Sequence, residues 1–108
     1  MLHARLHIAQ LEIGGEPVAL RYGDLVVVAR AESAQLDWEV VVHTTEPTGL
    51  ENGHHDLSMT CIDGVEDSGA LTTTALSGPA FLVRSVGSAT VLRGSGHLDG
   101  FHMDRLVG

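Results

Sequence analysis

The stretch that decides the fold is Leu36-Asp37-Trp38-Glu39-Val40-Val41-Val42-His43. Its even positions are all apolar, and three of its four odd positions are polar. Side chains of a β-strand alternate between two faces, so this pattern predicts a strand with one face in a core and the other in water. The stretch also carries the only tryptophan of the chain. We therefore expect the core to be organised around this strand.

Composition indicates one globular domain. The chain has 108 residues, of which 44% are hydrophobic and only 4% are aromatic. A chain of this length buries roughly two thirds of the surface that it exposes when unfolded, which is enough for one core without a metal or a disulfide. Because aromatic residues are scarce, that core has to be built mainly from Val, Leu, Ile and Ala.

The charge excludes several classes of partner. Fourteen acidic residues stand against six arginines and no lysine, which gives a net charge of −8. The segment from Ala31 to Val83 contains nine acidic residues and no arginine. Such a surface repels phosphate groups, so we expect neither nucleic acid nor a membrane as a partner. The lack of lysine also excludes Schiff-base and P-loop chemistry.

The single cysteine, Cys61, has no partner for an internal disulfide. The N-terminus lacks the pattern of a signal peptide, and no segment contains the ~20 consecutive apolar residues of a membrane span. We therefore expect a soluble cytoplasmic protein.

Two further segments predict strands. Leu25–Ala29 is apolar on both faces, which predicts a central strand whose outer face is covered by a helix, a loop, the N-terminal segment or another subunit. Leu2–Ile13 alternates, but its parity changes near Ala9-Gln10, as it does at a β-bulge. The same segment also fits a helical stripe. We favour a strand there because the sequence that follows is strand-like.

Glycine and proline mark the expected breaks between strands. Gly14-Gly15 is a hairpin dipeptide, Gly23-Asp24 and Asp63-Gly64 predict turns, and Gly78-Pro79 predicts a break or a kink in its strand. The longest irregular segment, Thr45–His55, exceeds an ordinary hairpin loop, and loops of that length are often functional.

A short internal repeat supports a curved sheet. Leu76–Leu82 is matched sixteen residues later by Leu92–Leu98, and both segments read Leu-x-Gly-x-small-ring-Leu. Two adjacent strands that bend at equivalent glycines have this pattern when a sheet curls into a barrel. The predicted fold is therefore all-β, with one small antiparallel β-barrel of about seven or eight short strands and a two-sheet sandwich as the alternative.

Two His–carboxylate pairs are candidates for acid–base chemistry. His97 and Asp99 are separated by one residue, so on a strand they would lie on one face about 6.6 Å apart, within reach of a hydrogen bond. His43 and Glu39 form a wider pair on the opening strand. A couple of this kind can act as a general acid and base when it faces a pocket. The competing interpretation is a solvated polar face. The predicted catalytic residues are His97, Asp99 and His43.

Seven histidines raise the question of a metal site. The densest group is His54, His55 and Asp56, beside the long loop. Neighbouring strand residues point to opposite faces, so both histidines would bind one ion only from an irregular loop. The spacing matches no standard zinc set, which needs three or four converging ligands. We expect no metal site and no cofactor, with these three residues as weak candidates for ligands.

Three functions fit these patterns. The first is a barrel that binds an apolar small molecule, since about eight strands are just wide enough to hold one guest. A cofactor-free isomerase or cyclase that acts on such a guest is a sub-case. The residues lining that site would be Trp38, Val40, Val42, Met59 and Phe81. The second function is a structural or protein-interaction subunit that forms a homo-oligomer, and the third is a metal-dependent enzyme that uses the loop histidines. We expect the chain to self-associate.

Overall fold

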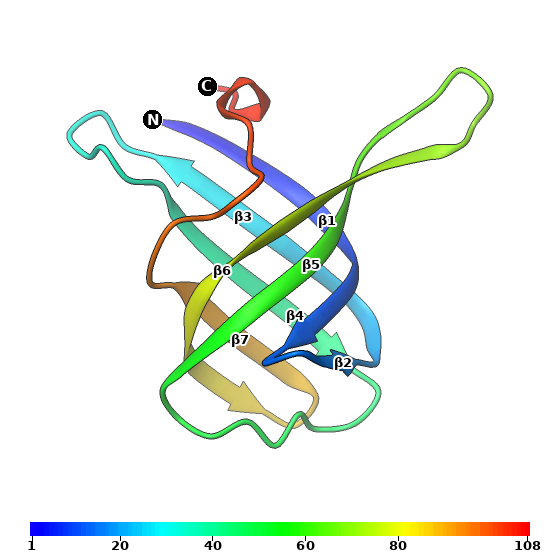
Figure 1. Cartoon of the computed structure of the whole chain (residues 1–108), viewed down its shortest axis with the longest axis vertical. Coiled ribbons are helices and arrows are strands. Elements are labelled where there is room, and N and C mark those ends of the chain that lie inside the picture. The colour runs from blue at the N-terminus through cyan, green and yellow to red at the C-terminus, as the bar shows by residue number, and fades with distance from the viewer.

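The computed structural model describes all residues from 1 to 108 and contains seven β-strands and one short 3-10 helix. The elements are β1 (Leu2–Ile13), β2 (Glu16–Val18), β3 (Leu20–Ala29), β4 (Asp37–Thr44), β5 (His54–Val65), β6 (Leu71–Val86), β7 (Ala89–Gly94) and η1 (Met103–Arg105). All strand pairings are antiparallel and belong to one sheet (Figure 1). No helix in the structure has the length and apolar character that crossing a membrane requires.

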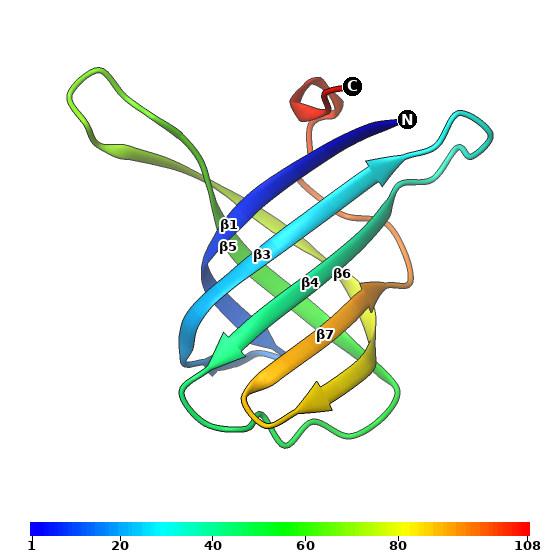
Figure 2. The same cartoon turned by 180° about the vertical axis from the view of Figure 1, so that it is seen from behind.

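Six of the strands form a nearly closed ring. They follow the order β1-β3-β4-β7-β6-β5, and β5 pairs back with β1. The first half of β1 pairs with β3, and the second half of β1 pairs with β5. The short β2 pairs with the last three residues of β1. Figure 2 shows β3, β4 and β7 side by side as one wall of the ring. The prediction of an all-β antiparallel fold is thus confirmed, with a near-closed ring rather than a formal barrel.

β1 is a strand with the predicted bulge. Its buried residues are Ala4 and Ile8 before the irregularity, and Leu11 and Ile13 after it. The register with β5 shifts between Ile8 and Gln10, where the parity of the sequence changes. A one-residue shift turns every following side chain to the other face, so the bulge returns the apolar residues to the core.

Two predicted turns lie inside strands instead, so those predictions were wrong: Gly23-Asp24 lies within β3 and Asp63-Gly64 within β5. Gly78-Pro79 was predicted to break or kink its strand, and it lies within β6 without breaking it. The register of β5 against β6 shifts at Asp63-Gly64, which identifies a bulge rather than a turn. At Gly23, a Cβ atom would come within 2.8 Å of Val42 Cγ1. Glycine inside a strand often marks such a close approach.

Trp38 lies in the core, as expected, and is only 2% exposed. Its indole ring covers two glycines, Gly94 of the neighbouring β7 and Gly78 of β6 beyond it. A Cβ atom at Gly94 would overlap the indole Cε2 and Nε1 atoms, and one at Gly78 would come within 2.9 Å of Cζ2. The indole Nε1–H donates to the carbonyl oxygen of Gly96 at 2.9 Å. Neither Gly78 nor Gly94 has a positive φ. These glycines therefore provide space, and the two copies of the internal repeat face the same tryptophan.

A cluster of sixteen buried apolar residues fills the ring. All six ring strands contribute to it, and Leu98 joins it from the segment after β7. The largest fully buried apolar side chains are Leu25, Leu57, Leu92, Val27, Val40 and Val42. A ring of about eight strands is just wide enough for side chains or one small ligand, so six strands leave space for side chains alone.

No helix, loop or N-terminal segment of the chain covers the outer face of Leu25–Ala29, so these predicted covers are wrong, while cover by another subunit stays a prediction. Leu25 and Val27 are buried in the core, whereas Val26 and Val28 on the outer face are half-buried. The N-terminal segment lies beside β3 as β1 and not over it. The two outer valines line an open hollow of about 320 Å³.

The C-terminal tail, residues 95–108, closes the side of the ring between β6 and β1. Ser77 of β6 and Asp99 exchange two backbone hydrogen bonds of 3.1 and 2.7 Å. His3 of β1 and Val107 exchange two more, both of 2.8 Å. These four bonds satisfy backbone groups on strand edges that the neighbouring strands leave unpaired.

Asp63 connects this tail to the β5–β6 hairpin. Its carboxylate accepts hydrogen bonds from Thr72 Oγ1 at 2.5 Å and from the Arg105 guanidinium at 2.8 Å. The Thr72 hydrogen bond, helped by Arg105 and opposed by burial, holds the pKa of Asp63 below its ordinary value. The carboxylate therefore joins β5, β6 and η1 through its charged form.

We predict that Gly94→Ala lowers the free energy of unfolding by about 1–3 kcal/mol, the usual cost of overpacking a core. The added methyl group overlaps the indole of Trp38. Denaturant unfolding at neutral pH measures this loss. In a Trp38→Leu background the same substitution should cost much less, because the overlapping ring is gone. An equal cost in both backgrounds would show that the indole does not make glycine necessary here.

We also predict that the hydrogen bond between Thr72 and Asp63 stabilises the fold at neutral pH and that this stabilisation is lost in acid. Because the pKa of Asp63 is lower in the folded than in the unfolded chain, its stabilising effect is complete above the unfolded value of about 3.9 and is lost as the pH falls through the folded value. Thr72→Val should therefore lower the melting temperature at neutral pH, and the deficit should shrink at about pH 2. The exposed Thr73→Val is the control. A deficit that does not change with pH would contradict this account.

Candidate functional site

The residues predicted to line a ligand site do not share a pocket. Trp38, Val40, Val42 and Met59 are all buried in the core cluster. Phe81 lies on the outer face of β6, since its neighbour Ala80 is the buried one, and its ring centroid is 6.0 Å from that of His54. That these five residues bind a ligand stays a prediction.

The four main hollows of the surface have volumes between about 190 and 320 Å³. The most enclosed of them, which we call the mouth hollow, has a volume of about 190 Å³. It lies where the β3–β4 loop meets the C-terminal tail. Its lining residues are Ala34, Gln35, Leu36, Gly96, His97, Leu98 and Met103. Drug-sized ligands fill pockets of roughly 300–1,000 Å³, so this hollow suits only a smaller molecule.

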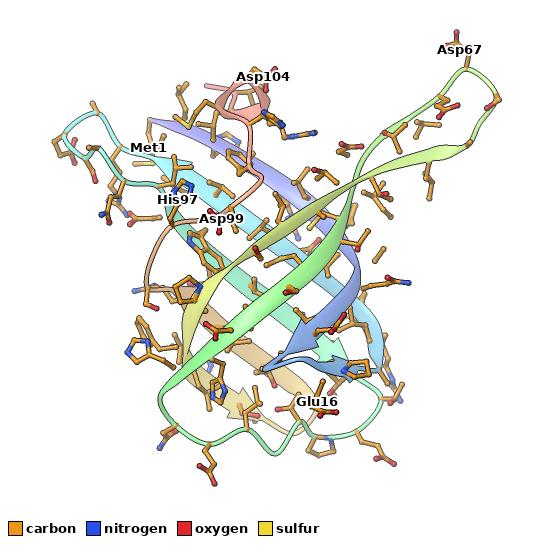
Figure 3. The ribbon with its side chains drawn as sticks, viewed as in Figure 1. Met1, Glu16, Asp67, His97, Asp99 and Asp104 are labelled. Atoms are coloured by element: carbon orange, nitrogen blue, oxygen red, sulfur yellow. The ribbon has the colours of Figure 1, made fainter.

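His97 and Asp99 lie close together, as predicted, but on the tail and not on a strand, and only His97 lines the mouth hollow. His97 Nε2 is 3.5 Å from Asp99 Oδ1, and the two side chains are 83% and 72% exposed. Figure 3 shows both residues on the tail segment that crosses the ring. Water screens a pair this exposed, so each group influences the other only weakly. A catalytic role for the pair stays a prediction.

His43 and Glu39 do not form the predicted pair. The His43 ring stacks on Tyr22 of β3, with centroids 4.3 Å apart, and Glu39 accepts a hydrogen bond from Arg93 at 3.3 Å. Both contacts join directly paired residues of neighbouring strands. Such cross-strand neighbours are much closer than residues four positions apart on one strand, which are separated by about 13 Å.

The closest His–carboxylate contact is one that the sequence analysis missed. His7 Nδ1 lies 2.8 Å from Asp24 Oδ1, and Arg5 donates to Asp24 Oδ2 at the same distance. The hydrogen bond from Arg5 is the main cause of a pKa of Asp24 below its ordinary value. None of the three residues lines one of the four hollows. The group therefore connects β1 and β3 on the surface of the sheet.

His54 and His55 are the first two residues of β5 and not part of the irregular segment predicted at Thr45–His55, and they have separate partners. His54 Nδ1 is 3.2 Å from Ser95 Oγ, and His55 Nε2 is 2.8 Å from the carbonyl oxygen of Glu51. Nowhere among the 108 residues do three or more His, Cys, Asp or Glu side chains converge in a way that could hold a metal ion. His54, His55 and Asp56 thus give a metal ion no common set of ligands.

Cys61 is a buried core residue. Burial raises the pKa of its thiol to about 12. The thiolate is the reactive form of cysteine, so this side chain is suited to packing and not to nucleophilic chemistry.

The β5–β6 hairpin extends beyond the ring as an arm, residues 63–73. The pairing of β1 with β5 ends at Ile62, so the rest of β5 has only β6 beside it. Figures 1 and 2 show this arm projecting away from the ring, and Figure 3 places Asp67 at its tip. Val65 and Leu71 are paired across the arm, and they are 67% and 59% exposed.

Sequence reasoning did not predict this arm. The dipeptide Asp63-Gly64 indicated that the strand ends there, whereas the structure continues both strands past it. The available signal was the run Leu71–Leu76, which contains three consecutive threonines and no charge. β-branched residues favour strands. The sequence does not show, however, that these strands outrun their neighbours.

Comparisons of the chain with known protein families, curated proteins and solved structures found no match.

Proposed function

We propose that the protein is a structural or protein-interaction subunit that acts by self-association, with the arm as its contact element. The arm is the observation that carries this proposal. It exposes the apolar pair Val65 and Leu71 at a place where the core of the same chain cannot cover them. Exposed apolar side chains that adjoin one another are typical of sites where proteins meet.

The arm is held in place by specific contacts. A two-stranded ribbon by itself is at best marginally stable in water. Here the carboxylate of Asp63 accepts hydrogen bonds from Thr72 on the opposite strand and from Arg105 in η1. This cluster fixes the base of the arm to the tail, which supports a function for the arm as a rigid projection.

The packed interior supports the same proposal. Sixteen apolar residues occupy the ring, so the surface is where this molecule meets its partners. The net charge of −8 supports protein partners over nucleic acid or anionic membranes.

Analytical ultracentrifugation tests the proposal. We expect the wild-type chain to form dimers at high concentration that dissociate on dilution. The double variant Val65→Ser/Leu71→Ser should remain a monomer, because it removes the exposed apolar pair of the arm. The matched control is Val83→Ser/Val86→Ser, which removes two exposed valines at the opposite end of β6 and should leave the dimer intact. A wild-type chain that is monomeric at every concentration would contradict the proposal.

A second candidate function is the binding of a small apolar molecule in the mouth hollow. The observation that favours it is the enclosure of this hollow between Leu36, Leu98 and Met103. Its wall includes Gly96, whose carbonyl oxygen accepts the hydrogen bond from the Trp38 indole. A ligand in the hollow would therefore disturb the environment of the tryptophan.

Fluorescence of Trp38 tests this candidate, with cyclohexanone as a small apolar probe. Binding predicts a saturable change in tryptophan emission, weakened by Met103→Glu, which places a charge on the apolar wall. The exposed Val86→Glu, at the far end of β6, is the control and should leave the change unaltered. A change that grows linearly with probe concentration would reject the candidate.

A further inference from the structure

We infer that the outer edge of β6 in the arm, Leu71–Thr74, pairs antiparallel with the same edge of a second copy of the chain. The two arms then form a four-stranded sheet across a two-fold axis. This inference rests on the proposed self-association and specifies its contact.

Within the arm, β6 has a neighbour on one side only. β5 pairs with it along one edge, from Leu71 onward. On the other edge, β7 pairs only from Ala80 onward, and the backbone hydrogen bonds of the tail reach β6 only at Pro79 and Ser77. The edge of Leu71–Thr74 is therefore free.

The direction of the backbone groups follows from the bridge at Ser77. Its N–H and C=O both bond to Asp99, so they point to the edge away from β5. Backbone groups alternate between the two edges of a strand, and β6 runs without a bulge from Leu71 to Ser77. The N–H and C=O groups of Leu71 and Thr73 therefore point to the same free edge as those of Ser77.

This edge lacks the devices that normally prevent strand pairing. Natural edge strands are protected by charged side chains, proline, bulges or short length. β2 illustrates this protection, since it has only three residues and contains Pro17. The segment Leu71–Leu76, in contrast, contains no charge and no proline. Such uncharged segments rich in β-branched residues readily add to another strand.

The charge distribution favours a second copy as the occupant. Two chains of charge −8 repel each other wherever acidic surfaces meet. The segment Leu71–Leu76 has no charged side chain and presents the same residues to itself, so the pairing brings no charged side chains of this segment together. In an antiparallel pairing the two arms point in opposite directions, which separates the acidic tips formed by Glu66 and Asp67.

The free groups also define the register. The carbonyl oxygen of Ala75 lies close against Gly100, where even a Cβ atom would overlap it, so this group is not available. Leu71 and Thr73 carry the available groups. A two-fold axis at Thr72 pairs each Leu71 with the Thr73 of the other copy. The free N–H and C=O groups of Leu71 and Thr73 in both copies are then hydrogen-bonded. The two Thr72 residues face each other as a non-hydrogen-bonded pair, with Cα atoms about 4.5 Å apart.

Disulfide trapping tests this register. A Cα separation of about 4.5 Å lies within the range that a disulfide spans. Thr72→Cys should therefore form a covalent dimer under mild oxidation, whereas the native Cys61 is buried and does not compete. The matched control is Ala75→Cys on the same strand, whose two copies would be about 20 Å apart and should not link. Equal cross-linking of both variants, or of neither, would overturn the inference.

Thr73→Pro provides the second test, because it removes one N–H of the free edge without removing a hydrogen bond to β5. We expect an unchanged circular dichroism spectrum and the loss of the dimer in ultracentrifugation. A dimer that persists in Thr73→Pro, without cross-linking of Thr72→Cys, would overturn this edge but leave self-association standing. A wild-type monomer at all concentrations would overturn both. If Thr73→Pro does not fold, the cross-linking result decides.

Discussion

The contact between the indole of Trp38 and the glycines of β6 and β7 is the constraint on which the rest of the structure depends. Because Gly94 and Gly78 have no side chains, these strands approach the ring of the tryptophan directly. The indole N–H is satisfied by Gly96 at the start of the tail, so the same residue also positions the segment that closes the ring. The result is a narrow ring filled by aliphatic side chains. Because this interior leaves no space for a ligand, the candidate functional sites lie on the surface.

Much of the fold could be predicted from the sequence, because the alternation of apolar and polar residues along a strand indicates which of its faces is buried. The pattern of Leu36–His43 identified the core strand, and the change of parity near Ala9-Gln10 located a bulge. The failures have a common physical cause. Gly23 predicted a turn and Gly78 a break or kink, but in the structure both lie inside strands where another side chain comes close. Local propensity contains no information about that distant neighbour.

The candidate site was less predictable because it depends on register. His97 and Asp99 are close in the sequence, and they meet as expected. His7 and Asp24 meet only because the β1–β3 register places them opposite each other. The arm depends on a mismatch in length, since β5 and β6 continue after β1 has ended its pairing. That mismatch is visible only when all the strands are placed together, and it leaves a neutral strand edge exposed on an acidic protein.

Hydrogen–deuterium exchange of single backbone amides, followed as a function of protein concentration, tests the central claim most directly. If two arms pair through β6, the amides of Leu71 and Thr73 are protected at high concentration and exchange rapidly after dilution. The amides that bond to β5 on the other edge should stay protected throughout, because they belong to the arm of a single chain. Rapid exchange of the Leu71 and Thr73 amides at every concentration would contradict the account.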